Sequence, residues 1–204
     1  MKGLLRKDFY LLWYYSRMLP VLVFGFILFS AFASSGESPF FTYYPCILGS
    51  ALSINLLAYD ESEHWCGYCD TLPVTRRQYV SGKYIMAFLC SGVIFLLSAA
   101  AAAVRFCRSG SWNLIDWVDQ AAVLATVAFL PAGLCLPLLF KYGAQKGRIA
   151  FIAVIGCFCG LTVVVDMPQL FGLSLPVALL PIVSLAIFAG SWLLSIRFYQ
   201  KREI

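Results

Sequence analysis

Long apolar runs without a charged residue near their centres constrain this chain most. They lie at residues 18–33, 41–58, 84–104, 118–140, 149–165 and 175–196. A helix needs about 20 apolar residues to cross the hydrocarbon of a bilayer. Only 12% of the 204 residues are charged, against roughly a quarter in soluble domains, and a chain this short has too little interior to bury so much apolar surface. The sequence therefore predicts one all-α domain, a polytopic membrane protein with six transmembrane helices.

The basic residues gather in every second segment that flanks or connects these runs. With the N-terminus inside, four inner segments hold all but two of the 15 Lys and Arg residues, the exceptions being Arg105 and Arg108. The inner segments are residues 1–17, 59–83, 141–148 and 197–204. Such an excess marks cytoplasmic loops, so both termini are expected in the cytoplasm and the chain in the cell membrane. No basic groove interleaved with aromatic residues is present, which argues against a nucleic-acid partner.

The stretch before the first apolar run favours a helix along the membrane surface. Leu5, Phe9 and Leu12 recur at helical spacing, and aromatic residues at 13–15 suit the headgroup level. An ordinary juxtamembrane anchor is the alternative. The Ala-Phe-Ala sequence at 31–33 resembles a signal-peptide cleavage site, but the long aromatic segment before it favours a span that is retained.

The sequence Trp-Cys-Gly-Tyr-Cys contains a pair of thiols, Cys66 and Cys69, spaced as in thioredoxin-type sites. Such a site lies where a strand meets a helix, and here apolar runs flank it on both sides. Cytoplasmic thiols are also normally kept reduced. With His64 the pair would offer three soft ligands, one fewer than a structural zinc site needs, so no metal is expected. A membrane thiol oxidoreductase using Cys66 and Cys69 remains the alternative function.

Ser81, Gly82 and Lys83 contain the Gly-Lys pair of a phosphate-binding loop. That loop also needs a Gly five residues before its second Gly and a Ser or Thr after the Lys. Arg77 and Tyr84 stand at those positions. We therefore expect no cofactor, no catalytic residue and no ATP hydrolysis by this chain.

Two segments carry a family resemblance. Pro73-Val74-Thr75-Arg76, followed by Gly82-Lys83, resembles the first cytoplasmic loop of type-2 ABC transporter permeases, and the opening MKGLLRKDFYLL resembles the start of small bacterial members. The resemblance implies the membrane-spanning subunit of an ATP-driven transporter, an exporter. It also implies a dimer with an identical or paralogous permease subunit, contact with membrane lipid, and a separate cytoplasmic ATPase subunit.

The resemblance makes residues 59–83 a cytoplasmic coupling loop whose short helix docks into a cleft of the ATPase. Aromatic anchors rimmed by charge suit such a contact. A capping box of Thr75 and Gln78 also predicts a helix that begins at Arg76 and continues into the third span. The expected coupling residues are Asp60, Glu61, Glu63, Trp65, Gly67, Tyr68, Leu72, Pro73, Val74 and Arg76.

Overall fold

A computed structural model describes most of the chain, and all of the described secondary structure is helical. The described residues are 2–15, 17–32, 40–63, 65–69, 71, 75–108, 113–143, 149, 152–156 and 179–200. The helices are α1 (Lys2–Tyr15), α2 (Met18–Phe32), α3 (Phe40–Ser62), α4 (Trp65–Cys69), α5 (Arg76–Arg108), α6 (Leu114–Tyr142) and α8 (Leu180–Gln200). The prediction of an all-α fold is confirmed for this part of the chain.

Four of these helices, α3, α5, α6 and α8, are long and apolar enough to cross a membrane. Helix α2 coincides with the first predicted run but has only 15 residues. It qualifies as a span only together with α1, from which it is bent by 75°. The fifth predicted run, 149–165, lies largely outside the described residues. Four spans, or five with the bent pair, are therefore found in the described part, and the count of six remains a prediction.

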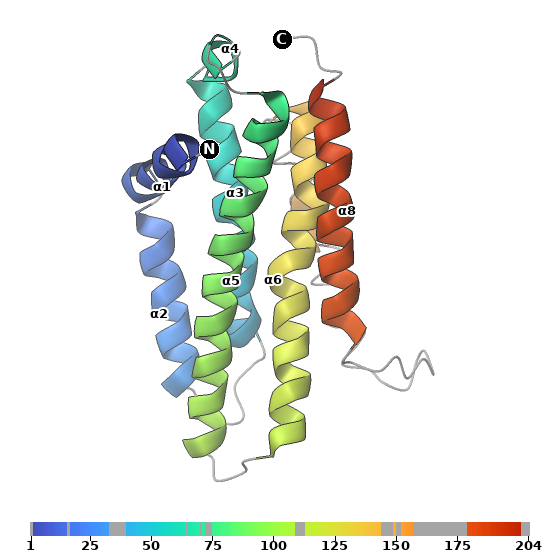
Figure 1. Cartoon of the computed structure of the whole chain (residues 1–204). Coiled ribbons are helices and arrows are strands. Elements are labelled where there is room, and N and C mark those ends of the chain that lie inside the picture. Colours follow the sequence, from blue (N-terminus) through green and yellow to red (C-terminus); the bar gives the residue numbers. More distant parts are fainter. Residues whose placement is uncertain are drawn as a thin grey trace.

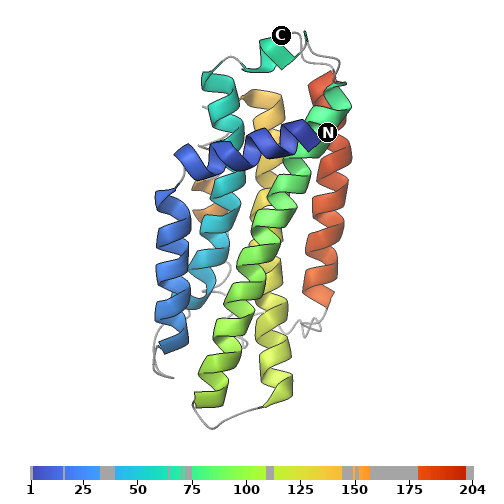
Figure 2. The same ribbon diagram turned by 60° about the vertical axis from the view of Figure 1, so that its left-hand side comes forward.

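Helices α2, α3, α5, α6 and α8 run side by side along the bundle (Figure 1), while α1 lies across it (Figure 2). Helices α1 and α4 lie at one end, together with the last turns of α3, α6 and α8 and the first turn of α5 (Figures 1 and 2). We call this end the α4 end. Basic side chains such as Lys7, Arg76, Lys141 and Arg197 belong to the elements at this end, whereas Arg105 and Arg108 close α5 at the opposite end. The predicted charge asymmetry therefore coincides with the two ends of the bundle.

Helix α5 begins where the capping pattern predicts. The backbone N–H of Thr75 donates to Gln78 Oε1 at 3.2 Å, and the N–H of Gln78 donates to Thr75 Oγ1 at 3.3 Å. These reciprocal bonds satisfy two backbone donors at the N-terminus of α5. Helix α6 is capped after Tyr142 by Gly143, whose φ of 83° favours glycine and whose N–H donates to the Leu139 carbonyl at 2.8 Å.

Helices α6 and α8 approach closely because a glycine lies between them. A Cβ atom at Gly133 would stand 3.2 Å from the Phe188 Cα. Small residues permit such contact between membrane helices. Helix α5 joins the pair through Tyr84, whose hydroxyl lies 2.6 Å from Ser191 Oγ and 2.7 Å from Ser195 Oγ. One side of the bundle is thus held by both close packing and buried hydrogen bonds.

Candidate functional site

Four charged side chains meet inside the α4 end of the bundle. They are Lys7 and Asp8 of α1, Asp60 of α3 and Lys83 of α5. Asp8 and Asp60 are each 2% exposed and Lys83 is 3% exposed, while Lys7 is partly exposed. We call these four residues the charge cluster. Two positive and two negative groups make it electrically neutral.

The ion pairs of the charge cluster form a closed ring. Lys7 Nζ lies 2.7 Å from Asp60 Oδ1 and 3.4 Å from Asp8 Oδ1. Lys83 Nζ lies 2.9 Å from Asp8 Oδ1 and 2.5 Å from Asp60 Oδ2. The Tyr79 hydroxyl also donates to Asp60 Oδ2 at 2.8 Å. Each lysine therefore contacts both carboxylates, and Asp60 accepts from three groups.

The ring joins three helices that are far apart in the sequence. Asp60 belongs to the last turn of α3, and Lys83 lies two turns into α5. Asp8 lies on the buried side of α1. Removing a charge from water costs several kcal/mol, and only a well-paired, hydrogen-bonded partner offsets that cost. The arrangement therefore ties α1, α3 and α5 to one another, since moving any one of them would leave a buried charge without its partner.

Helix α4 is attached to the same cluster through Trp65. Lys7 Nζ lies 4.2 Å from the centre of the Trp65 ring, a cation–π contact. Trp65 also packs against the buried hydrophobic cluster that contains Tyr79 and Tyr199. Its neighbour Tyr68, with ring centres 5.3 Å apart, is 56% exposed. One side of α4 therefore faces the bundle and the other faces outward.

Comparison with known families now identifies the chain. The family described as ABC-2 family transporter protein matches residues 3–200, nearly the whole chain. This protein belongs to the ABC-2 family. It is therefore a membrane subunit of an ABC transporter, a class whose members carry substrate across the membrane and are not themselves catalytic. No curated protein matches the sequence.

The structure of this ABC-2 permease places the predicted coupling residues in different environments. Asp60 is buried in the charge cluster, and Trp65 is half-buried against the bundle. Glu63 and Tyr68 are exposed. Glu61 and Arg76 are of intermediate exposure, and Gly67 lies within α4. The remaining three, Leu72, Pro73 and Val74, lie outside the described residues.

Sequence reasoning missed the partners of Asp60. Lys7 and Lys83 count in the sequence only among the basic residues of the inner segments, with Lys83 also in the Gly-Lys motif, and no role is expected for Asp8 or Tyr79. A usable signal was present, because ionisable residues at the edges of apolar runs commonly pair with one another. The identity of each partner depends on tertiary contacts, and none of these residues is adjacent to Asp60 in the sequence.

One thiol of the predicted pair, Cys69 of this permease, is buried, whereas a redox site needs an accessible thiol. Both cysteines lie on the short helix α4, and Cys69 is buried in the same hydrophobic cluster as Tyr79 and Tyr199. Reactive cysteines need an accessible, electropositive setting, and burial among apolar groups makes a thiol inert. The location of Cys69 therefore fits a small packing residue.

Proposed function

We propose that this permease is the membrane-spanning subunit of an ATP-driven exporter in the cell membrane, with its α4 end and both termini in the cytoplasm. Two copies, or this chain and a paralogous one, form the pathway between them, and a separate ATPase subunit binds beneath. The family match and the gathering of basic residues at the α4 end support this assignment.

The coupling surface in this proposal is the outward side of α4 and the turn before it. Tyr68 is the exposed aromatic anchor, and Glu63 is exposed close by in the sequence. Aromatic side chains that enter a pocket supply most of the energy of such contacts, whereas charges at the rim mainly steer association. Trp65 has a different role, because it fixes α4 to the bundle.

One observation carries the proposed coupling route: Lys7 contacts both the Trp65 ring of α4 and the carboxylate of Asp60 in α3. Asp60 and Asp8 in turn hold Lys83 of α5. A displacement of α4 by the ATPase is therefore passed to α1, α3 and α5 together. Helix α5 has 33 residues and carries the motion along the length of the bundle.

The test of the docking surface is binding of the partner ATPase to the purified permease. Tyr68→Ala removes an anchor worth ~2 kcal/mol when buried at an interface, so affinity should fall by about tenfold or more. Tyr142→Ala is the matched control, since Tyr142 is similarly exposed at the α4 end but lies on α6. Unchanged affinity of the Tyr68 variant would contradict docking through α4.

The test of the route is the stimulation of ATP hydrolysis by the permease in the reconstituted complex. Lys7→Gln combined with Asp8→Asn keeps the charge cluster neutral and the exposed side of α4 unchanged, but breaks the link from Trp65 to Asp60. We expect normal ATPase binding and reduced stimulation. Equal stimulation by the variant and the wild-type permease would contradict transmission through the charge cluster.

Orientation has its own test. A reporter that is active only outside the cell should be silent when fused after Ile204 and active when inserted after Arg108. The reverse result would place the α4 end outside the cell, where it could not meet a cytoplasmic ATPase.

A further inference from the structure

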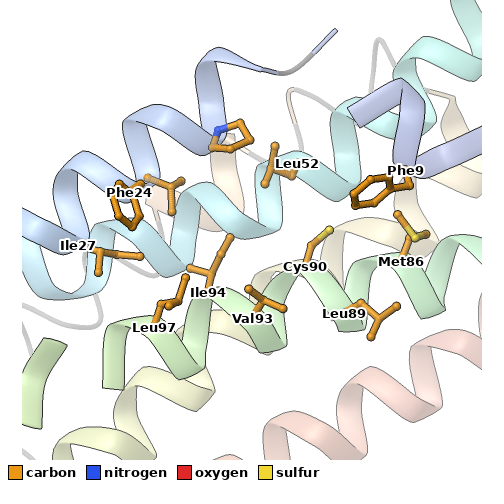
Figure 3. Close-up of a pocket in the computed structure, with 12 residues that line it drawn as sticks. Phe9, Phe24, Ile27, Leu52, Met86, Leu89, Cys90, Val93, Ile94 and Leu97 are labelled. Atoms are coloured by element: carbon orange, nitrogen blue, oxygen red, sulfur yellow. The ribbon is translucent and has the colours of Figure 1, made fainter. Parts of the chain in front are cut away.

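An apolar cavity of about 550 Å³ lies between α2 and α5 and is not used by the coupling route. The two helices form its walls, Leu52 of α3 forms its floor, and Phe9 of α1 closes it at the α4 end (Figure 3). Figure 2 shows how α1 crosses the bundle at the head of these helices. The volume falls within the range of small-molecule sites. We call this cavity the α2–α5 groove.

The lining of the groove is entirely apolar and reaches below the surface of the bundle. Val23 and Ile27 of α2 and Ile94 of α5 line it and are buried, whereas Leu89 and Val93 at its mouth are exposed. From Met86 to Leu97 the groove follows α5 for about 16 Å, at a rise of about 1.5 Å per residue. It is therefore a long slot that opens sideways from the bundle.

The end of the groove at α1 is cationic. Arg6 lies one helical turn before Phe9, so the two share a side of α1; Arg6 is exposed, as is Arg17 in the turn after α1. The only acidic residue of α1, Asp8, is buried and bonded to Lys83. The exposed surface of α1 therefore presents positive charge without a compensating carboxylate, next to aromatic side chains that suit the headgroup level.

We propose that the groove holds an acyl chain of an anionic phospholipid whose headgroup binds at α1, with Arg6 as its main cationic contact. The lining is apolar along its length and ends at Phe9, one helical turn from the exposed Arg6, which suits a molecule with a hydrocarbon chain and an anionic headgroup better than a protein helix. If the groove were empty, the side chains that line it would lack van der Waals contacts on one side, so an acyl chain that fills it is stabilised. An acyl chain in the groove contributes little selectivity, because different phospholipids carry similar chains. The preference for an anionic phospholipid therefore comes from the contact of its headgroup with Arg6.

The experiment counts the lipid that stays with the full-length permease. The protein is reconstituted in vesicles of equal parts phosphatidylglycerol and phosphatidylcholine, re-extracted in mild detergent, and its bound lipids are identified by mass spectrometry. Wild-type protein should retain phosphatidylglycerol in preference to phosphatidylcholine. Arg6→Gln should lower that preference about fivefold, the effect of one basic residue at an anionic surface. Arg197→Gln, an exposed cation of α8, should leave it unchanged.

The groove itself is tested by filling it. Val93→Trp places a large ring at the mouth and should remove the retained lipid, and Val93 is exposed enough for the ring to be accommodated. Leu193→Trp is the control, since Leu193 is equally exposed on α8, away from the groove. Equal retention of both lipids by wild-type protein would overturn the proposal. Retention of lipid by the Val93→Trp variant would also overturn it. The same holds if the wild-type protein retains no lipid and Val93→Trp changes only the oligomeric state.

Discussion

Lys83 of α5 contacts Asp8 of α1 at 2.9 Å, across 75 positions in the sequence, and both side chains are almost fully buried. The same lysine contacts Asp60 of α3. Lys83, near the start of α5, therefore holds α1, α3 and α5 together through its buried ion pairs.

Loss of Lys83 should destabilise the permease strongly. Lys83→Met leaves two carboxylates with one lysine in a buried site, and breaking a buried pair costs about 3–5 kcal/mol. The melting temperature in detergent should fall sharply for this variant, whereas Lys141→Met, at an exposed position of the same end, should have little effect. The double variant Lys83→Met with Asp8→Asn restores neutrality and should recover much of the loss. A single variant as stable as wild type would contradict the buried ring.

Trp65 and Tyr68 should behave differently although both lie on α4. Trp65→Ala removes the ring that packs on the bundle and contacts Lys7, so the melting temperature should fall by the equivalent of about 2 kcal/mol or more. Tyr68→Ala removes an exposed ring and should leave the melting temperature unchanged. Both values can be read by thermal unfolding of the permease without its partner. Equal losses in the two variants would show that α4 is not oriented as described.

The hydroxyl of Tyr84 should stabilise the contact between α5 and α8. Tyr84→Phe keeps the ring against Phe140 and Phe188 but removes both bonds to serines of α8. We expect a loss of about 1 kcal/mol, the usual size for hydrogen bonds between membrane helices. Tyr10→Phe, at an exposed site of α1, is the comparison. A denaturation midpoint that does not move would mean that the serines find other partners.

The close approach of α6 and α8 should depend on Gly133. Gly133→Leu forces a side chain against the Phe188 backbone, and such overpacking typically costs about 1–3 kcal/mol. At Gly190 of α8, a Cβ would meet nothing within 4 Å, so Gly190→Leu controls for the change in helix propensity. Thermal unfolding of the two variants measures the difference. Identical stability would indicate that α6 and α8 can separate freely at this point.

Local signals in the sequence predicted several elements well. The capping box of Thr75 and Gln78 predicts the first residue of α5 correctly, because its two hydrogen bonds join residues within one turn and do not depend on tertiary contacts. The first apolar run, 18–33, coincides with α2 to within one residue, since apolar length alone decides such a helix. Helices α1 and α2 are bent from one another by 75°, and the placement of α1 along the membrane surface remains a prediction.

The candidate site was only partly predictable. The family resemblance of residues 59–83 placed Asp60 among the residues expected to couple to the ATPase. The burial of Asp60 depends on pairing with Lys83 of α5 and with Lys7, which reaches it because α1 crosses the end of the bundle. The division of α4 into a bundle-facing Trp65 and an outward Tyr68 likewise follows from packing, since both are aromatic residues of one short segment.

The closed ring of ion pairs also bears on the order of synthesis. A chain is made from its N-terminus, so Asp8 and Asp60 reach the membrane before Lys83 does. Until α5 arrives, Lys7 alone faces two carboxylates, and α1 cannot settle across the bundle without burying a net negative charge. We therefore expect α1 to dock only after α5 has reached the membrane. A nascent permease truncated before Lys83 would present α1 loose at the membrane surface, where quality-control proteases could recognise the unfinished chain.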